Sequence, residues 1–373
     1  MTPRNALLLL SIALVFESAA QDTKPKKNKK KDQEPVTQAL VVLEDPPGAA
    51  VGETDRLIFR VSPLTSKGLL SVQVHEALKT LLQDNHGAIV KLRAFVAGSG
   101  DLRRVQTLVS EVFSERKLNV PALSTIQVGA LPMEGAQVVI ESIAEEKKTD
   151  KKTVNPAGLA FFSGQQAKDV NQSIAQLRTA MDSVSVSREN VLRATCFLSS
   201  LDEFSGDRTA IHAAFPSAAV NFVQQQRLGL DQLVECEAVG RLEKSPASSH
   251  ENGLVTLVNP PALMQNPNYS QIALVSAAKI VFSGTQMAFG DQDKDVRLAF
   301  DRLRKVLEAQ SVSYKDVFWS ATYPLTKTMT DKVRAIRFDY YDRSHPPAST
   351  LLLFEGLPSL DATAAVEVAA VAK

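Results

Sequence analysis

The sequence predicts an α/β (α+β) fold built from three copies of one small unit. The first observation is a short apolar strand pattern that closes on a polar residue and occurs three times, at residues 57–62, 159–165 and 280–286. The second is that an amphipathic stripe at helical spacing follows each of these strands. The third is that two polar stretches, residues 145–152 and 243–252, separate the copies. Repetition in a fixed order is typical of repeat architectures.

Each copy continues in the same order: strand, helix, strand, helix, strand, strand. The second strands are predicted at residues 88–96, 191–198 and 317–323. A second helix follows each of them, reduced to a stub over 207–214 in the middle copy. A strand–helix–strand step favours parallel pairing. The last two strands of each copy are joined by a short loop, so we expect them to pair antiparallel.

The composition shifts along the chain divide it into five regions. They are a signal peptide (1–20), a Lys-rich linker (21–34) and three units (35–145, 153–243 and 253–373). A basic start at Arg4, an apolar run over 6–16 and the small residues 18–20 are the three parts of a secretory signal peptide. We therefore expect export to the periplasm or the extracellular space, with no stable membrane insertion after cleavage. An uncleaved anchor or a buried N-terminal helix is the alternative.

Charge and motifs exclude several classes of function. Residues 1–34 carry a net charge of +3 and the whole chain +1, so residues 35–373 carry −2, which argues against a nucleic-acid partner. No His or Cys spacing suits a metal, and no nucleotide-binding or nucleophile motif is present, so we predict no metal and no cofactor. Cys196 and Cys236 are interpreted as two small buried side chains. Export would permit a disulfide between them, and the sequence leaves that open.

The closing segments carry a family resemblance. Residues 121–132 read PALSTIQVGALP, followed by Glu141-Ser142-Ile143-Ala144, and residues 266–271 read NPNYSQ. This pattern resembles the RidA (YjgF) family, whose signature is Pro-Ala-Arg, an alternating strand, a Leu-Pro turn and a final Glu-Ala-Ile-Ala. Related endings occur at residues 237–240 and 369–372. The resemblance covers nearly all of residues 50–373.

The resemblance implies three chorismate-mutase-like units, each a mixed sheet with two helices on one face. Three such units pack in this family as a trimer with ligand sites in the clefts. Here we expect an intramolecular pseudo-trimer, which makes the chain a monomer with a small-molecule ligand at the clefts. Copies in one chain cover the apolar sheet faces of each other without a loss of association entropy.

The resemblance also points to site residues. The substrate-binding Arg of Pro-Ala-Arg is replaced by Leu123, Ala218 and Ser349, none of which binds a carboxylate by charge. Tyr269 matches a ligand-contacting Tyr of the family and joins these three as predicted substrate-binding positions. Glu141 and Glu237 match a Glu that positions water, and we predict them as catalytic. The third copy is interpreted as having Ala369 there.

Three functions remain open at this point. The first is a divergent enamine or imine deaminase-type hydrolase, or a ligand-binding relative, that lacks the carboxylate-binding Arg. The second is a non-catalytic small-molecule-binding pseudo-trimer, and the third, less favoured, is an endoribonuclease. A substitute guanidinium could come from Arg60, Arg193 or Arg227, although an Arg on a strand face is more often simply solvated.

Overall fold

The computed structural model describes residues 43–98, 100–147, 153–226, 229, 231–246 and 253–372. The expected signal peptide (1–20) and linker (21–34) lie outside the described residues. Within these ranges, no helix is both long enough and apolar enough to cross a membrane.

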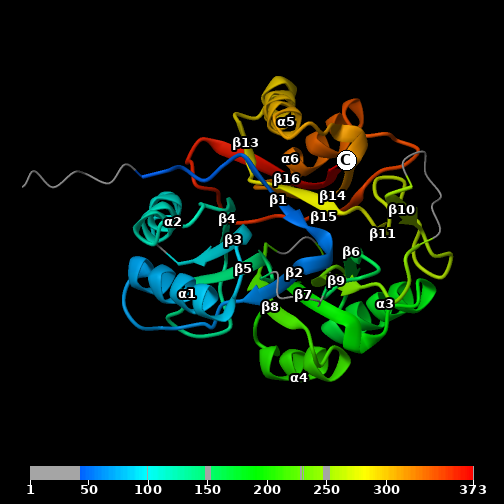
Figure 1. Cartoon of the computed structure of the whole chain (residues 1–373), viewed down its shortest axis with the longest axis horizontal. Coiled ribbons are helices and arrows are strands. Elements are labelled where there is room, and N and C mark those ends of the chain that lie inside the picture. The colour runs from blue at the N-terminus through cyan, green and yellow to red at the C-terminus, as the bar shows by residue number, and fades with distance from the viewer. Residues whose placement is uncertain are drawn as a thin grey trace, which may run out of the picture. The chain divides into compact units, whose positions relative to one another are not determined.

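The described chain forms three mixed sheets, each with helices on its outer side (Figure 1). The first sheet has the strand order β2-β5-β3-β4. Its elements along the chain are β2 (Leu57–Val61), α1 (Leu70–Asp84), β3 (Ile89–Ala97), α2 (Arg103–Glu115), β4 (Ala122–Val128) and β5 (Val138–Glu145). Strands β3 and β4 are parallel, and the β2–β5 and β3–β5 pairs are antiparallel.

The second sheet repeats this arrangement in the order β6-β9-β7-β8. Its elements are β6 (Leu159–Ala167), α3 (Val170–Ser183), β7 (Val191–Leu198), α4 (Phe204–Ala214), β8 (Ala219–Gln224) and β9 (Val234–Arg241). The predicted stub is thus an eleven-residue helix that begins at Phe204. Two further strands, β11 (Ile272–Val275) and β10 (Val255–Val258), extend this sheet beyond β6.

The third sheet has the order β1-β12-β16-β14-β15, with β13 also paired to β16. Its elements are β1 (Ala49–Glu53), β12 (Lys279–Ser283), β13 (Gln286–Phe289), α5 (Asp293–Glu308), β14 (Val317–Pro324), α6 (Lys327–Ile336), β15 (Ala348–Leu351) and β16 (Ala362–Ala372). Short 3-10 turns η1 (Thr54–Arg56), η2 (Arg188–Asn190), η3 (Tyr314–Asp316) and η4 (Arg337–Asp339) complete the list.

The expected antiparallel pairing of the two closing strands is wrong. In the first sheet β5 lies between β2 and β3, and β4 pairs with the far side of β3. The connection from β4 to β5 therefore passes across β3 instead of forming a hairpin. The parallel step predicted for strand–helix–strand occurs across the second helix of each stretch, as in β3–β4, β7–β8 and β14–β15.

The sheets also exchange strands along the chain. Strand β1 precedes the first sheet in sequence but pairs with β12 of the third sheet, where Val51 lies opposite Val281. Strands β11 and β12 are separated by only three residues, yet β11 pairs with β6 of the second sheet and β12 with β16. Strands β1 and β11 therefore pair with sheets formed mainly by residues outside their own predicted units.

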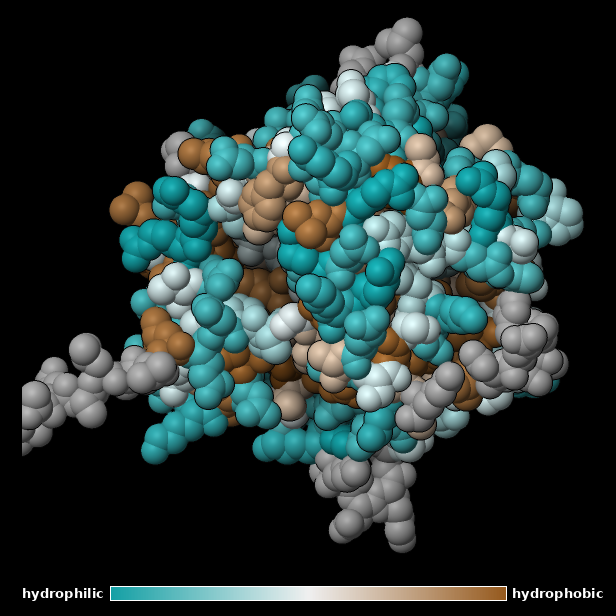
Figure 2. Space-filling model, turned by 90° about the horizontal axis from the view of Figure 1, so that it is seen from above, coloured by the Kyte–Doolittle hydropathy of each residue, from teal (hydrophilic) through white to brown (hydrophobic). Residues whose placement is uncertain are grey.

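Both faces of each sheet are apolar, and the two faces are covered differently. The outer faces pack on their own helices in three separate clusters, for example Val74, Leu78 and Val109 on the first sheet. The inner faces of all three sheets share one cluster, which includes Phe95, Phe197 and Tyr323. On the surface visible in Figure 2, hydrophobic residues form scattered spots among hydrophilic ones, as is normal for a protein surface.

Several helices start where local chemistry favours it. Asp169 caps α3 by accepting a hydrogen bond from the backbone N of Gln172, and Thr326 caps α6 through Met329 N. Gln292 and Asp295 form a reciprocal capping box at the start of α5. These side chains satisfy backbone N–H groups that have no partner inside the helix.

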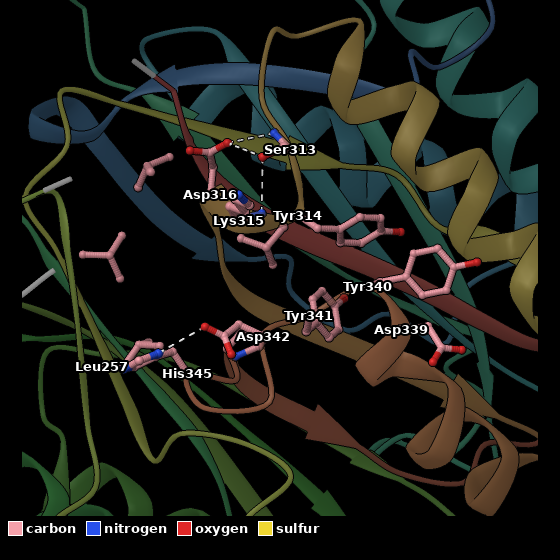
Figure 3. A pocket seen from close by; sticks show the side chains of 14 residues that line it. Leu257, Ser313, Tyr314, Lys315, Asp316, Asp339, Tyr340, Tyr341, Asp342 and His345 are labelled. Atoms are coloured by element: carbon pink, nitrogen blue, oxygen red, sulfur yellow. Dashed lines mark hydrogen bonds and ion pairs between the residues drawn. The ribbon is translucent and has the colours of Figure 1, made fainter. Parts of the chain in front are cut away.

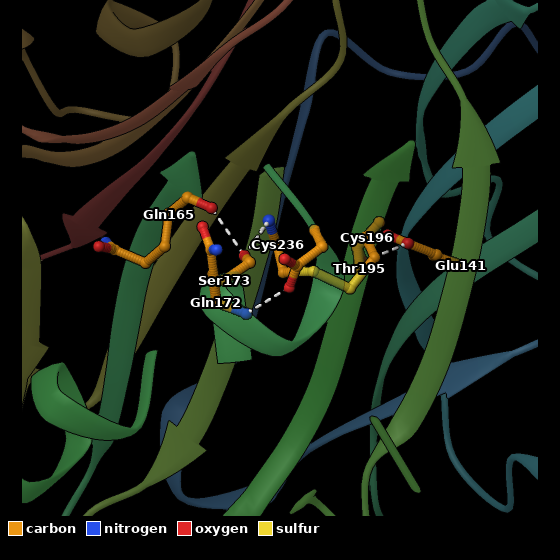
Figure 4. The surroundings of a disulfide bond; sticks show 8 residues. Glu141, Gln165, Gln172, Ser173, Thr195, Cys196 and Cys236 are labelled. Atoms are coloured by element: carbon orange, nitrogen blue, oxygen red, sulfur yellow. Dashed lines mark hydrogen bonds between the residues drawn. A yellow bond between two sulfur atoms is a disulfide. The ribbon is translucent and has the colours of Figure 1, made fainter. Parts of the chain in front are cut away.

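Cys196 and Cys236 form a disulfide, which corrects the interpretation of two separate buried side chains (Figure 4). The antiparallel register of β7 and β9 places the two residues directly opposite each other, with their Cα atoms 4.1 Å apart. The backbone N of Cys236 also donates to Ser173 Oγ of α3. The sequence could not reveal the pairing, because it did not specify how β9 aligns with β7.

Replacing both cysteines with Ala should lower the free energy of unfolding by about 3–4 kcal/mol, because the bond closes a loop of 40 residues in the unfolded chain. Urea unfolding of the oxidised wild type and the double variant measures the difference. Reduced wild type is the control and should match the variant. Equal midpoints for oxidised wild type and variant would contradict a stabilising role.

Candidate functional site

A buried ion cluster lies where the inner faces of the three sheets meet. We call it the central ion cluster, and it comprises Lys91, Arg93, Glu141, Arg193, Glu237 and Glu367. Arg93 Nε donates to Glu141 Oε2 at 2.9 Å and Arg93 Nη2 to Glu237 Oε1 at 2.6 Å. Lys91 Nζ donates to Glu367 Oε2 at 2.5 Å. Each of these contacts except Arg93–Glu141 joins two different sheets.

Polar side chains complete the hydrogen bonding of two of the three carboxylates, Glu141 and Glu237. Thr195 Oγ1 and Asn221 Nδ2 donate to Glu141 Oε1 at 2.7 and 2.8 Å, and Thr350 Oγ1 donates to Glu237 Oε2 at 2.6 Å. Burial alone would raise the pKa of Glu141, but Arg93 and Arg193 outweigh it and lower the pKa to about 2. The carboxylate is therefore ionised and fully paired at neutral pH.

Glu367, and not Ala369, is the third member of this set. In the strand registers Glu141 lies opposite Arg93, Glu237 opposite Thr195, and Glu367 opposite Ala321. The assignment of Ala369 from sequence was shifted by two residues. A shift of two keeps the same face of a strand, so the alternating pattern could not reveal the error.

The cavity at the central ion cluster is small. Its volume is about 30 Å³, and its lining includes Lys91, Arg93, Glu141 and Arg193. A space of this size holds about one water molecule. Glu141 and Glu237 are themselves members of buried ion pairs. The catalytic roles predicted for them stay predictions.

A second cavity, of about 210 Å³, lies between β6 and β9 of the second sheet and β15 and α6 of the third. We call it the β6–β15 cleft. Two predicted substrate-binding residues, Tyr269 and Ser349, line it together. Ser349 is anchored by its backbone N, which donates to Ser163 Oγ of β6 at 2.8 Å. The other lining residues are Gly164, Gln166, Gln232, Glu235, Met264, Asn266, Asn268, Arg334, Arg337 and Leu351.

Glu235 is the carboxyl group of this cleft. It lies two residues before Glu237 on β9, and it is 3% exposed. Gly164 makes room for it, because a Cβ at position 164 would lie 1.8 Å from Glu235 Oε1. Burial raises the pKa of Glu235 to about 8, with a further upward contribution from Glu237 and opposing ones from Gln166 and Arg334. The group is a neutral acid at pH 7.

Tyr269 contributes a phenol to the same space. Burial, and then the nearby Glu235, raise the pKa of Tyr269 to about 12, so its hydroxyl keeps its proton at neutral pH. The cleft therefore combines two groups that can donate a proton with the amide side chains of Gln166, Asn266 and Asn268.

The β6–β15 cleft differs in chemistry from the equivalent positions on the other sheets. The residue two places before Glu141 on β5 is Val139, and the residue two places before Glu367 on β16 is Ala365. Neither can bind or transfer a proton. Of the three strand positions that correspond by register, only the one on β9 holds a carboxyl group.

Two guanidinium groups also line the cleft, from an element that the sequence interpretation did not consider. Arg334 lies in the last turn of α6 and Arg337 begins η4 directly after it. Arg337 is 2% exposed, whereas the side chain of Arg334 is 45% exposed. Their spacing of three residues on one helical segment puts them on one side, which was the signal available in the sequence.

The remaining predicted residues lie elsewhere. Leu123 is half-buried on β4, where its carbonyl accepts a hydrogen bond from Thr285 N, and Ala218 packs against the helix-side core of the second sheet. Arg60 is half-buried and donates to Asn85 Oδ1. Arg193 belongs to the central ion cluster, and Arg227 lies outside the described residues.

A larger and more open pocket, of about 760 Å³, lies beside η3 and η4 (Figure 3). Several of its polar groups are engaged with one another or with the fold. Asp316 accepts from Ser313 N and Oγ, Asp342 pairs with His345, and the hydroxyl of Tyr314 donates to the carbonyl of Phe300. We therefore place the candidate site in the β6–β15 cleft. In the described part of the chain, no group of three or more His, Cys, Asp and Glu residues could hold a metal ion.

One family model matches part of the chain. Residues 68–146, which run from α1 to β5, match the family model described as endoribonuclease L-PSP, the RidA/YjgF family. No curated protein sequence matches the chain.

Solved structures of that family are similar to parts of the chain. One is a protein of unknown function of the conserved Rid family from Yersinia pestis, with 15% identity and a TM-score of 0.30, covering 32% of this chain and 98% of its own. A YjgF family member from Mycobacterium tuberculosis has 16% identity and a TM-score of 0.24, covering 32% and 99%. One from Neisseria meningitidis has 11% identity and a TM-score of 0.24, covering 32% and 95%.

Replacing Glu235 with Gln should change how stability depends on pH. The pKa of Glu235 is about 8 in the folded chain against an ordinary value of 4.5, so its contribution is fully present below about pH 4.5 and is lost as the pH rises towards 8. We expect the wild type to lose stability relative to E235Q between about pH 5 and 8. Urea unfolding at a series of pH values measures this, and the histidines cancel because both proteins have them. A constant difference between the two curves would contradict the raised pKa.

Proposed function

We propose that the chain is a set of three tandem RidA-like units that form an intramolecular pseudo-trimer. The support is the shared order of elements, the shared sheet order, and the single apolar cluster formed by the three inner faces. The exchange of β1 onto the third sheet and of β11 onto the second links neighbouring units further.

The charges of the central ion cluster support an assembly that contains one copy of each of the three units. The first unit contributes Lys91, Arg93 and Glu141, a net charge of +1. The second contributes Arg193 and Glu237, a net charge of zero, and the third contributes Glu367, a net charge of −1. Together they are neutral. Three copies of the first unit would bury a net charge of +3 and three copies of the third −3, and unpaired buried charge is strongly destabilising. Divergence of the copies thus favours assembly within one chain.

Replacing Glu367 with Gln should lower the free energy of unfolding by about 3–5 kcal/mol, because Lys91 would be left buried without its anion. The double variant Lys91→Met with Glu367→Gln should recover most of that loss. Urea unfolding of the two variants measures it, with Asp231→Asn of the exposed Lys168–Asp231 pair as a control that changes stability little. Additive losses in the double variant would contradict the pairing.

For the activity, we propose hydrolysis of a small imine or enamine in the β6–β15 cleft. The observation that carries this is the buried carboxyl of Glu235, which has a pKa near 8 and faces the cavity beside Tyr269. A group with a pKa close to the working pH is suited to give and take a proton in turn.

The chemistry needs one carboxyl group and one water molecule. Glu235 as the neutral acid protonates the imine nitrogen, and its carboxylate then accepts a proton from the water that attacks the imine carbon. The resulting carbinolamine takes that proton on nitrogen, and its C–N bond breaks while the Glu235 carboxylate accepts the hydroxyl proton. This gives a carbonyl compound and ammonia and restores Glu235 as the neutral acid. The walls of the cleft hold the substrate near the acid and limit access of bulk water.

Glu235→Gln should lower the rate of ammonia release from a responsive imine by about 10²–10⁴-fold, since the amide cannot transfer the proton. The assay uses the full chain with a panel of neutral imines and of 2-imino acids generated in situ. Glu141→Gln is the contrasting variant. It should lower the free energy of unfolding, and it should have a smaller effect on the rate of ammonia release per folded molecule. An unchanged rate in E235Q would rule out this role of Glu235.

The alternative is a small-molecule-binding pseudo-trimer without catalysis, favoured by the apolar residues Val139 and Ala365 at the corresponding positions of the other two sheets. Binding in the cleft with no ammonia release from any imine would support it. Endoribonuclease activity, named in the description of the matching family model, is a third candidate. The slightly acidic body of the chain gives it little support.

We further propose that the protein is exported, as a monomer, to the periplasm or the extracellular space. The signal-peptide pattern of residues 1–20 supports this, and the Cys196–Cys236 disulfide suits an oxidising compartment.

A further inference from the structure

Arg337 is a buried cation without an anion. It begins η4 and is 2% exposed, and neither its Nε nor its Nη2 has a hydrogen-bond partner among the residues that the structure describes. Its guanidinium carbon lies 5.7 Å from the ring centre of Phe338 and 5.3 Å from that of Tyr341. Contacts with aromatic rings stabilise a cation, but much less than water or a carboxylate does.

The surroundings make this charge costly in the ligand-free protein. Burial is the main cause that lowers the pKa of Arg337, and the positive charge of Arg334 adds to it, with Tyr341 opposing. A buried Arg is ordinarily paired with a carboxylate, because an unpaired charge in the interior is strongly destabilising. The fold keeps Arg337 at this position nonetheless, at the wall of a cavity.

The β6–β15 cleft is positively charged at neutral pH. Among the described residues that line it, the charged or ionisable ones besides Tyr269 are Glu235, Arg334 and Arg337. Glu235 keeps its proton at pH 7, so the lining has no anion to set against the two guanidinium groups. Asp331 Oδ1 lies 3.8 Å from Arg334 Nη1, but this ion pair is exposed to solvent and therefore weak.

We propose that Arg337, with Arg334 nearer the mouth, binds the anionic group of a small ligand in the β6–β15 cleft. The ligand class is a small organic anion with a carboxylate or phosphate group, because a planar guanidinium with free N–H groups matches these oxygens. The reacting part of such a ligand faces Glu235. This inference rests on the proposed function in that both use the β6–β15 cleft, and it does not depend on hydrolysis there.

The cation that we propose binds the anionic group lies on a different element from the position at which the family resemblance places an Arg. Ser349 on β15 stands where the family resemblance places an Arg, and it lines the same cleft. The positive charge instead enters from the end of α6, which turns the anionic end of the ligand towards η4. The identity of the residue on β15 alone therefore does not decide whether the cleft binds anions.

The test measures binding to the full chain with four probes of graded charge: succinate, acetate, inorganic phosphate and uncharged succinamide. Isothermal titration and the shift of the unfolding temperature are the two readouts. We expect succinate or phosphate to bind and to raise the unfolding temperature, and succinamide to do neither. The stronger of these two anions identifies the anionic group as carboxylate or phosphate. No response to any anion would overturn the proposal.

Variants make the test specific to Arg337. Arg337→Met should weaken anion binding by about 30-fold or more, and Arg334→Met by less, because only Arg337 is fully buried. Arg337→Met should also raise the unfolding temperature of the protein without anions, since it removes a buried unpaired charge. A merely structural Arg would instead lower it, and that result together with unchanged anion binding would contradict the proposal.

Two controls keep the outcomes separate. Arg178→Met, on the exposed side of α3, removes a positive charge away from the cleft and should leave anion binding unchanged. Glu235→Gln should retain anion binding while it loses hydrolysis, so a failure of the proposed reaction and a failure of the anion site give different results. If Arg337→Met does not fold, Arg337→Lys replaces it, with weakened but measurable binding expected.

Discussion

The packing of three apolar inner sheet faces against one another is the constraint on which the rest of this structure depends. Each sheet has helices on one side only, so its other face must be covered by the remaining two sheets. Charges placed at the meeting point have to balance within the interior. The central ion cluster does so with three cations and three carboxylates supplied unequally by the three sheets. Its role is to fix which surfaces meet.

The same packing creates seams between sheets, and the seams differ in the residues that line them. Around the β6–β15 cleft, a glycine at 164 leaves room for the carboxyl of Glu235, and α6 delivers Arg337 to the opposite wall. At the other two corresponding positions the strand carries Val139 or Ala365. Of these three strand positions, only the one on β9 places a carboxyl group beside a cavity lined by Tyr269 and Arg337. A single chain permits this asymmetry, which identical subunits could not have.

Much of the fold could be predicted from local patterns, because alternation in strands and apolar stripes in helices report directly on burial. The order of strands and helices followed from such patterns. The family motifs pointed to Tyr269 and Ser349 as separate positions, and both line the β6–β15 cleft. Pairing did not follow. The position of β5 between β2 and β3, the alignment of Cys196 with Cys236, and Glu367 in place of Ala369 all depend on register, which a period of two residues leaves undetermined. Arg337 was missed because its burial results from packing between distant segments.

The exchange of β1 onto the third sheet has a consequence for how the chain is made. Ribosomes deliver this strand early, but its partner β12 begins only at Lys279, more than two hundred residues later. Until β12 has been synthesised, β1 has no strand partner among the described residues. The first sheet can be completed early in synthesis, whereas the third sheet is completed only after β16, near the end of the chain, has emerged.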